Sequence, residues 1–351
     1  MKLKKLIPTG CAFLTVFLYF YHSEIIISAV KEALFLCYDT VIPSLFLFIV
    51  FSCFVSGLKN IDLISIPFTP FLRILNISNR RIITYIVLSI FGGFATGGYF
   101  LNRINEEFDC DENMSKVLTV LLSGNSPSFV ITAVGAKLLG NIKTGVMLYI
   151  ALLLSAYMTA FLLSFIFPYN HIQTLKADFD TENSFILAIK QSVTAIINIC
   201  GIVIVAYSIC KVFSLYINNY VVLYTLSAFS EVTTACFYVN QHCADNLYLY
   251  CICLCVLPLS SALQIKSFIN DSYLNLLPLY ISKLFQLPVA VCVLRILINI
   301  FPVTASVYAS RDIRVNMYWN SPHISFYMFL LSVCFVVLFD KKAKVFTKFN
   351  K

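Results

Sequence analysis

Charged residues are scarce in this chain. Only 12% of its 351 residues are Asp, Glu, Lys or Arg, whereas a soluble domain carries about 25%. Hydrophobic residues make up 60% of the chain, and its mean hydropathy is +0.86. This composition excludes an ordinary soluble domain. It predicts an all-α polytopic membrane protein, because helices satisfy their own backbone hydrogen bonds in lipid.

Residues that carry catalytic chemistry are scarce as well. The four histidines (His22, His171, His242 and His323) stand at predicted membrane borders or in loops, without paired spacing. The sequence has no His-Glu-x-x-His, no Gly-x-Ser-x-Gly and no loop long enough for a nucleotide-binding domain. Most of the 13 cysteines lie in apolar runs, where cysteine behaves as a small hydrophobic residue. We therefore predict no enzyme activity, metal or cofactor, and no nucleic-acid binding, because no long basic stripe exists.

Apolar stretches of spanning length, about 17–25 residues, recur along the chain. We predict about ten membrane segments, near 6–21, 41–57, 82–100, 116–136, 144–167, 196–216, 219–238, 246–264, 280–301 and 322–340. A segment that holds an interruption could instead enter and leave on one side, which would change the count. The first segment follows Lys4-Lys5 and resembles a signal peptide; we interpret it as an uncleaved helix, with cleavage as the alternative.

The loops predict an orientation. Lys and Arg concentrate at both termini and at 59–81 and 137–143, whereas acidic residues concentrate at 101–115 and 168–183. Short cytoplasmic loops are enriched in Lys and Arg. We therefore predict a multi-pass protein of the cell membrane with both termini in the cytoplasm and both basic loops on that side. The net charge of +8 suits a bilayer that contains anionic lipid.

We interpret the order of segments as an internal duplication. Residues 24–39 and 184–195 mix apolar and charged residues, and each is predicted to lie along the membrane interface. Each is followed by a span, a span with a small polar patch, an interrupted span and a long span. The predicted units are an N-terminal helix (1–23), a first repeat (24–167), an acidic loop (168–183), a second repeat (184–301) and a C-terminal helix with a basic tail (302–351). Parallel and inverted repeats both remain open.

Two polar runs interrupt the apolar segments at similar places in the two units. The first is Ser123-Gly124-Asn125-Ser126-Pro127-Ser128 and the second is Pro258-Leu259-Ser260-Ser261-Ala262-Leu263-Gln264. Proline breaks or kinks helices, and paired interruptions in two halves of a membrane protein point to a transporter-like binding site. The alternative is two unrelated proline kinks. The candidate ligand groups are Asn125, Ser126, Ser128, Ser260, Ser261 and Gln264, which suit a neutral or zwitterionic solute because they both donate and accept hydrogen bonds.

The spans before these runs carry the other two patches. The first holds Gly92, Gly93, Gly97 and Gly98, and small residues allow close helix packing or an unwound backbone. The second holds Glu231 and Thr233, and a carboxylate inside a span is costly unless it faces a cavity or a partner. Packing alone remains the alternative for each patch.

These runs resemble the sporulation integral membrane proteins of the YlbJ type, in the Gate (nucleoside-recognition) domain superfamily. The resemblance runs from about Val41 to Ile298. It rests on Val41-Ile42-Pro43-Ser44-Leu45-Phe46, on Gly92 to Tyr99, on Ser123 to Ile131 with Val134-Gly135 and Leu139-Gly140, on Glu231-Val232-Thr233, on Ser260 to Gln264, and on Lys283. The chain departs from the family where Ala95 replaces Pro, Tyr99 replaces Lys, Ser126 replaces Gly, and Pro258-Leu259 replaces a glycine pair.

The resemblance implies a role in spore formation, with transporter-like architecture. We expect a protein that moves or senses a small polar solute during formation of the spore cortex. The alternative is a membrane scaffold that transports nothing and holds a spore-assembly partner. A homo-oligomer is compatible with both. A transporter requires the polar groups to converge on one cavity, whereas a scaffold requires a patch on a loop or on the lipid face.

Overall fold

The structure is a computed structural model that describes residues 17, 19–58, 61–169, 173–174, 185–217, 219–267 and 277–301. Their regular secondary structure is helical apart from a short antiparallel pairing of β1 (Phe108–Asp109) with β2 (Gln173–Thr174). Six helical stretches are long and apolar enough to cross a membrane: Ser23–Ser56, Arg80–Glu107, Ile142–Ile166, Phe185–Phe213, Leu247–Lys266 and Leu277–Ile300. The predicted all-α fold is confirmed, and the six apolar stretches indicate a multi-pass membrane protein, whereas the described residues do not confirm the predicted count of ten segments. The predicted segment 322–340 and most of 6–21 lie outside the described residues.

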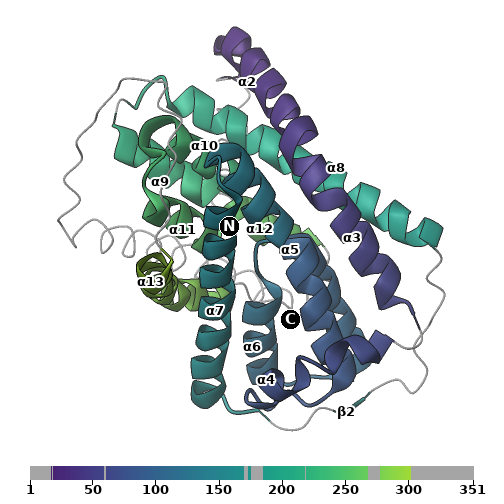
Figure 1. Ribbon diagram of the computed structural model, residues 1–351. Coiled ribbons are helices and arrows are strands. Elements are labelled where there is room, and N and C mark those ends of the chain that lie inside the picture. Colours follow the sequence, from purple (N-terminus) through teal and green to yellow (C-terminus); the bar gives the residue numbers. More distant parts are fainter. Residues whose placement is uncertain are drawn as a thin grey trace, which may run out of the picture.

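Two long helical rods cross each other on one side of the molecule (Figure 1). The first consists of α2 (Ser23–Leu36), the π-helical turn η1 (Cys37–Val41) and α3 (Ile42–Ser56); the second is α8 (Phe185–Phe213). The π-helical turn lies just before Pro43, where a proline would otherwise break the hydrogen-bond ladder. Neither rod has a break near residue 40 or residue 195, so the predicted separate interfacial helices are wrong.

The helix α5 (Arg80–Glu107) folds back on itself at Gly93, whose φ of 74° and ψ of −155° are not helical. The Tyr85 hydroxyl donates to Glu107 at 2.8 Å, and the rings of Tyr85 and Phe100 stack with centroids 5.2 Å apart. In a straight helix residues 85 and 107 would be about 33 Å apart. We call α5 hairpin 1. The predicted single span at 82–100 is therefore wrong: the length and composition of Arg80–Glu107 would allow one crossing, but the reversal at Gly93 makes it two short antiparallel arms.

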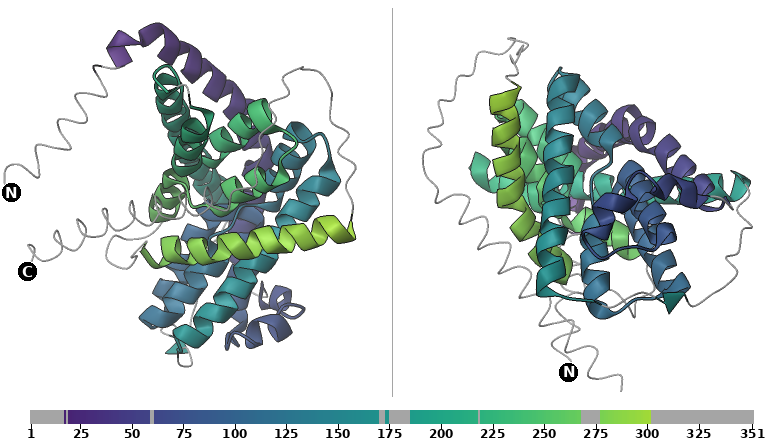
Figure 2. Two further views of the ribbon diagram at one scale, coloured as in Figure 1. Left: turned by 90° about the vertical axis from the view of Figure 1, so that its left-hand side faces the viewer. Right: turned by 60° about the horizontal axis from the view of Figure 1, so that its bottom comes forward.

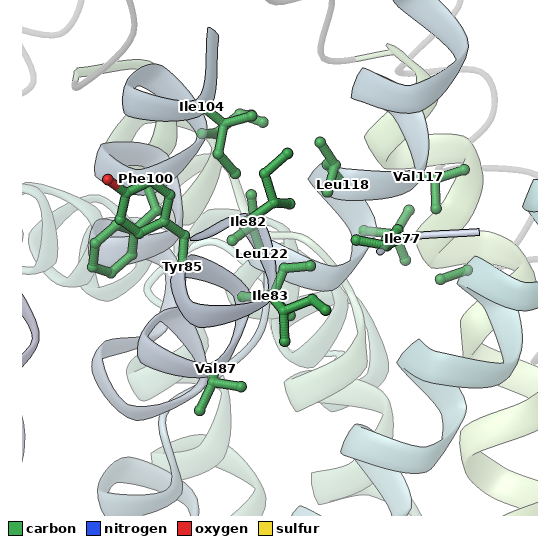
Figure 3. Close-up of a cluster of buried hydrophobic side chains, with 14 of the residues drawn as sticks. Ile77, Ile82, Ile83, Tyr85, Val87, Phe100, Ile104, Val117, Leu118 and Leu122 are labelled. Carbon is green, nitrogen blue, oxygen red and sulfur yellow. The ribbon is translucent and has the colours of Figure 1, made fainter. Parts of the chain in front are cut away.

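The interior of hairpin 1 is an apolar cluster contributed by both of its arms. Ile82 and Tyr85 from the first arm lie beside Ile104 and Phe100 from the second (Figure 3). Leu118, from the next helix, belongs to the same cluster. All five side chains are buried, so the hairpin packs as one body with its neighbours.

A second hairpin is formed by α9 (Tyr220–Ser230) and α10 (Val232–Cys243), with Glu231 at its tip. The rings of Tyr220 and His242 lie with centroids 4.8 Å apart, although 22 residues separate them along the chain. The two arms are therefore antiparallel. We call α9 and α10 hairpin 2, and the predicted single span at 219–238 is wrong.

Each hairpin is followed by a broken helix. The first consists of α6 (Glu112–Leu122), a non-helical stretch at 123–126, and a helix that starts at Pro127 and continues as the π-helical η3 (Phe129–Leu138). The second consists of α11 (Leu247–Cys255), a break at 256–258, and α12 (Leu259–Ser267). Both polar runs interrupt helices as predicted, but the second break lies one turn before Ser260 and Ser261.

A long helix follows each broken helix. The helix α7 (Ile142–Ile166) contacts both halves of the first broken helix, and α13 (Leu277–Ile300) crosses α7 (Figure 2). Asn113 at the start of α6 donates to the Pro168 carbonyl at 3.0 Å, just beyond the end of α7. The first broken helix therefore runs antiparallel to α7 along its whole length.

The two hairpins enter the molecule from opposite ends. The base of hairpin 1 continues through β1 into α6 and lies at the C-terminal end of α7, next to η2 (Ile61–Ser65) and α4 (Thr69–Arg73). The base of hairpin 2 packs in one cluster with Leu138 and Leu139, at the N-terminal end of α7. The basic stretches at 61–81 and 137–143 therefore lie at opposite ends of the bundle. Because α7 is about 37 Å long, a membrane crossed by α7 would separate the two stretches, contrary to their predicted placement on one side.

Candidate binding cavity

A small cavity of about 40 Å³ lies where the tips of both hairpins meet both broken helices. Its lining includes the candidate residues Gly92, Gly93, Asn125, Ser126, Glu231, Thr233, Ser261 and Gln264. Apolar side chains complete it: Val41, Leu45, Phe94, Ala95, Phe129, Ile199, Val203 and Val232. The other candidates (Gly97, Gly98, Gly124, Pro127, Ser128, Pro258 and Ser260) are not in that lining. The volume corresponds to roughly three water molecules.

The tip of hairpin 1 lies against the first break. A Cβ atom on Gly93 would lie 3.1 Å from the Ser126 nitrogen, and the positive φ of Gly93 disfavours any other residue. Gly97 has a packing role, because a Cβ there would lie 1.8 Å from the Leu122 carbonyl oxygen. Gly98 likewise packs against Ile265 of α12. Both interpretations of the glycine patch therefore apply. Gly93 allows the backbone to reverse, and Gly97 and Gly98 allow close helix packing.

Serine and asparagine side chains satisfy the helix ends around the first break. Ser126 Oγ accepts a hydrogen bond from the Phe129 N–H at 3.2 Å and so caps the helix that follows. Ser128 Oγ donates to the Ser44 carbonyl of α3 and lies 3.2 Å from Ser126 Oγ. Asn125 Nδ2 donates to the Leu254 carbonyl at 2.6 Å, near the C-terminal end of α11. Asn125 thus joins the two breaks directly.

The C-terminal end of α6 is held by Lys283, a buried lysine from α13. Its Nζ donates to the Ser123 carbonyl at 2.6 Å and to Gln286 Oε1 at 2.9 Å. A cation at a helix C-terminus is favourable, because the helix dipole is negative there. Gln286 in turn donates to the Leu152 carbonyl and to Ser155 Oγ on α7, both at 3.2 Å. Only the family resemblance pointed to Lys283, although a lysine inside an apolar span is itself a signal.

Glu231 separates the two arms of hairpin 2 and caps the second. Its carboxylate accepts from the Thr234 N–H at 2.6 Å and from Thr234 Oγ1 at 3.0 Å. The backbone of Glu231 is extended, as expected for an N-cap residue. The side chain is buried and borders the cavity. Glu231 therefore has a structural partner and also faces the space where a solute would bind.

The first turn of α12 follows the second break directly. It contains Ser260 and Ser261, which are 2% and 1% exposed. Among the described residues neither Oγ has a hydrogen-bond partner. Ser261 and Gln264, one turn later, both line the cavity.

A larger cavity of about 300 Å³ lies between α3, the second arm of hairpin 1 and α8. Ala95 lines both cavities, so the two are adjacent. Thr96 and Tyr99 border it from hairpin 1, and Lys190, Gln191 and Thr194 border it from α8. The sequence did not predict this second cavity.

A buried charge network fixes the base of hairpin 1. Arg103 pairs with Glu107 at 2.7 Å, and Tyr85 donates to the same carboxylate. Arg81 donates to the Tyr85 hydroxyl at 3.0 Å and to the Ser56 carbonyl at the end of α3. The sequence interpretation placed Glu107 in an acidic loop and missed this network, which only a folded-back helix can form.

Comparison with known proteins yields no family model, no curated protein and no solved structure that matches this chain.

Proposed function

We propose that this protein moves a small polar solute across the membrane or senses such a solute, with the small cavity as its binding site. The observation that supports this proposal most is that polar residues from distant parts of the sequence line the same cavity. The tips of both hairpins, the first break and the start of α12 line one cavity, and all of these except the tip of hairpin 1 contribute its six polar candidate residues. A scaffold has no need to gather such groups inside the bundle, where each must be desolvated.

The order of elements supports an inverted duplication within the proposed repeats 24–167 and 184–301. Each contains a long rod, a hairpin, a broken helix and a long helix. Each unit would cross the membrane three times if its hairpin enters and leaves on one side. An odd number of crossings inverts the second unit relative to the first. Inverted repeats with broken helices at their interface are a common basis of alternating access in transporters.

The resemblance to YlbJ-type proteins supports a role in spore formation in the cell membrane, with cortex assembly as the proposed stage and both termini in the cytoplasm. A spore-assembly partner or a second copy of the chain is compatible with this role. Loss of the gene should lower the yield of heat-resistant spores. Comparison of small polar metabolites in sporulating cells with and without the gene should reveal the solute that accumulates or is depleted.

The sharpest test of transport uses Ala95→Cys, because Ala95 lines both cavities and is 3% exposed. A membrane-impermeant thiol reagent is applied separately to right-side-out and inside-out vesicles. The native Cys53, which lines the larger cavity, is replaced by serine in this variant and in its control. If the cavity opens to each side in turn, the new thiol is labelled from both sides. The matched control is Ala160→Cys, a fully buried position on α7 outside both cavity linings, which should remain unlabelled. Labelling from one side only, or from neither, would contradict transport.

A further inference from the structure

The helix ends around the cavity differ in whether side chains of the protein satisfy their free backbone N–H and C=O groups. The first N–H groups and last carbonyls of a helix have no partner within the helix, and other groups must satisfy them. Lys283 satisfies the end of α6, and Asn125 satisfies that of α11. Ser126 caps the helix after the first break, and Glu231 caps α10. Four of the helix ends beside the cavity are therefore covered by side chains of the protein.

The N-terminus of α12 differs. Pro258 precedes it, and the first intrahelical bond is the one from the Ala262 N–H to the Pro258 carbonyl at 3.1 Å. The three earlier N–H groups, at 259–261, have no acceptor within the helix. The hydroxyls of Ser260 and Ser261 are buried in the same turn without a partner among the described residues, and Ser261 borders the cavity. A buried hydroxyl without a partner is unfavourable, so this helix end is open to a group that the described residues do not supply.

The charges on the two sides of the cavity indicate the chemistry of the group that binds at the start of α12. A helix N-terminus carries about half a positive charge, which favours a carboxylate or another anion. Across the cavity Glu231 presents a carboxylate, which favours a cation. We propose that the solute is a small zwitterion of the amino-acid type. Its carboxylate lies at the N-terminus of α12 against Ser261, and its ammonium faces Glu231. The cavity of about 40 Å³ holds only about three water molecules, so even glycine requires it to widen on binding, and large amino acids are disfavoured. This inference rests on the proposed function and adds its substrate class.

The test is thermal unfolding of the purified full chain in detergent, with glycine or L-alanine at low millimolar concentration. Binding to the folded state raises the unfolding midpoint, and we expect a rise of about 2 °C or more. Acetate and methylammonium, each carrying one of the two charges, should produce no comparable rise at equal concentration. No response to either amino acid, or an equal response to acetate alone, would overturn the assignment.

A pair of variants separates binding from general stabilisation by the added solute. Ser260→Ala with Ser261→Ala removes only unpartnered hydroxyls, so the empty protein should keep its unfolding midpoint or gain slightly. The response to glycine should fall at least tenfold in apparent affinity. The matched control is Ser208→Ala on α8, a 1% exposed serine whose hydroxyl bonds to the Ile204 carbonyl of its own helix. It should respond like the wild type. A double variant that keeps the full response would overturn the site. Two-sided labelling of Ala95→Cys is independent of the solute, so the transport proposal can survive if the zwitterion inference fails.

Discussion

At the scale of single residues, Glu231 has two roles that substitution can separate. Its carboxylate caps α10 through the Thr234 N–H and hydroxyl, and its charge faces the cavity. A cap needs only an acceptor oxygen, which glutamine retains. A cation-binding role needs the charge itself. Substitution by glutamine and by leucine therefore tests one property each.

We expect Glu231→Gln to reach normal abundance and normal thermal stability but to lower the yield of heat-resistant spores. Glu231→Leu should in addition lose about 1–3 kcal/mol of stability, because the cap is removed and the Thr234 N–H loses its partner. Protein abundance in membranes, the unfolding midpoint and heat-resistant spore counts measure these effects. Normal spore counts with the Gln variant would mean that the charge of Glu231 has no functional part.

At the scale of elements, the base of hairpin 1 depends on a buried ion pair. The side chains of Arg103 and Glu107 are 14% and 8% exposed. Removing one partner of a buried pair costs about 3–5 kcal/mol, because the other charge stays buried without compensation. Glu112 and Lys116 form a similar i,i+4 pair at 2.9 Å, but the Glu112 side chain is 86% exposed. The exposed Glu112–Lys116 pair is therefore a control for the effect of burial on the Arg103–Glu107 pair.

We expect Glu107→Gln to lower the free energy of unfolding by about 3–5 kcal/mol, and Glu112→Gln to lower it by less than about 1 kcal/mol. Replacing both partners, with Arg103→Met and Glu107→Leu, should recover part of the loss, since no lone charge then remains buried. Denaturant or thermal unfolding in detergent compares the four proteins. Equal effects of the two single Gln variants would show that hairpin 1 does not close as described.

At the scale of the whole molecule, the opposed hairpins make a topological prediction. Asn79, before hairpin 1, and Asn141, before α7, cap their helices at opposite ends of the bundle. The variants Asn79→Cys and Asn141→Cys should therefore react with an impermeant thiol reagent from opposite sides of the membrane. Labelling of both from one side would contradict the inverted arrangement and restore the topology expected from the basic loops.

The background reaction in that experiment is small at the hairpin 1 end. Cys110 lies in the loop between hairpin 1 and α6, where partial burial and the nearby carboxylates of Asp111 and Asp109 raise the pKa of its thiol to about 12. The thiolate is the reactive form, so Cys110 should label slowly at neutral pH and faster as the pH rises. The wild-type chain provides this baseline directly.

The sequence predicted the positions that interrupt helices, but not the path of the chain. Pro127, Pro258 and Gly93 are visible because proline and glycine act locally on the backbone. Hydropathy cannot distinguish one crossing from a hairpin of two half-crossings, because both bury an apolar stretch of similar length. The pairing of Arg103 with Glu107 and Tyr85 depends on that unseen reversal. Six candidate ligand residues nevertheless meet in one cavity, because the first break, the tip of hairpin 2 and the start of α12 all border it.

The two hairpins are fastened by different means, and this bears on which side of the cavity opens more readily. The base of hairpin 1 is held by charged groups in fixed directions, so displacing it would strand Arg103 or Glu107 in a poorly solvated place. Around the base of hairpin 2 the rings of Tyr220, Tyr238 and His242 pack as tilted and stacked pairs, and such contacts are weaker than a buried ion pair. If the protein transports a solute as proposed, we expect unequal barriers to the two openings: exchange with the compartment at the hairpin 2 end would be fast, and exchange with the other compartment would limit the turnover rate.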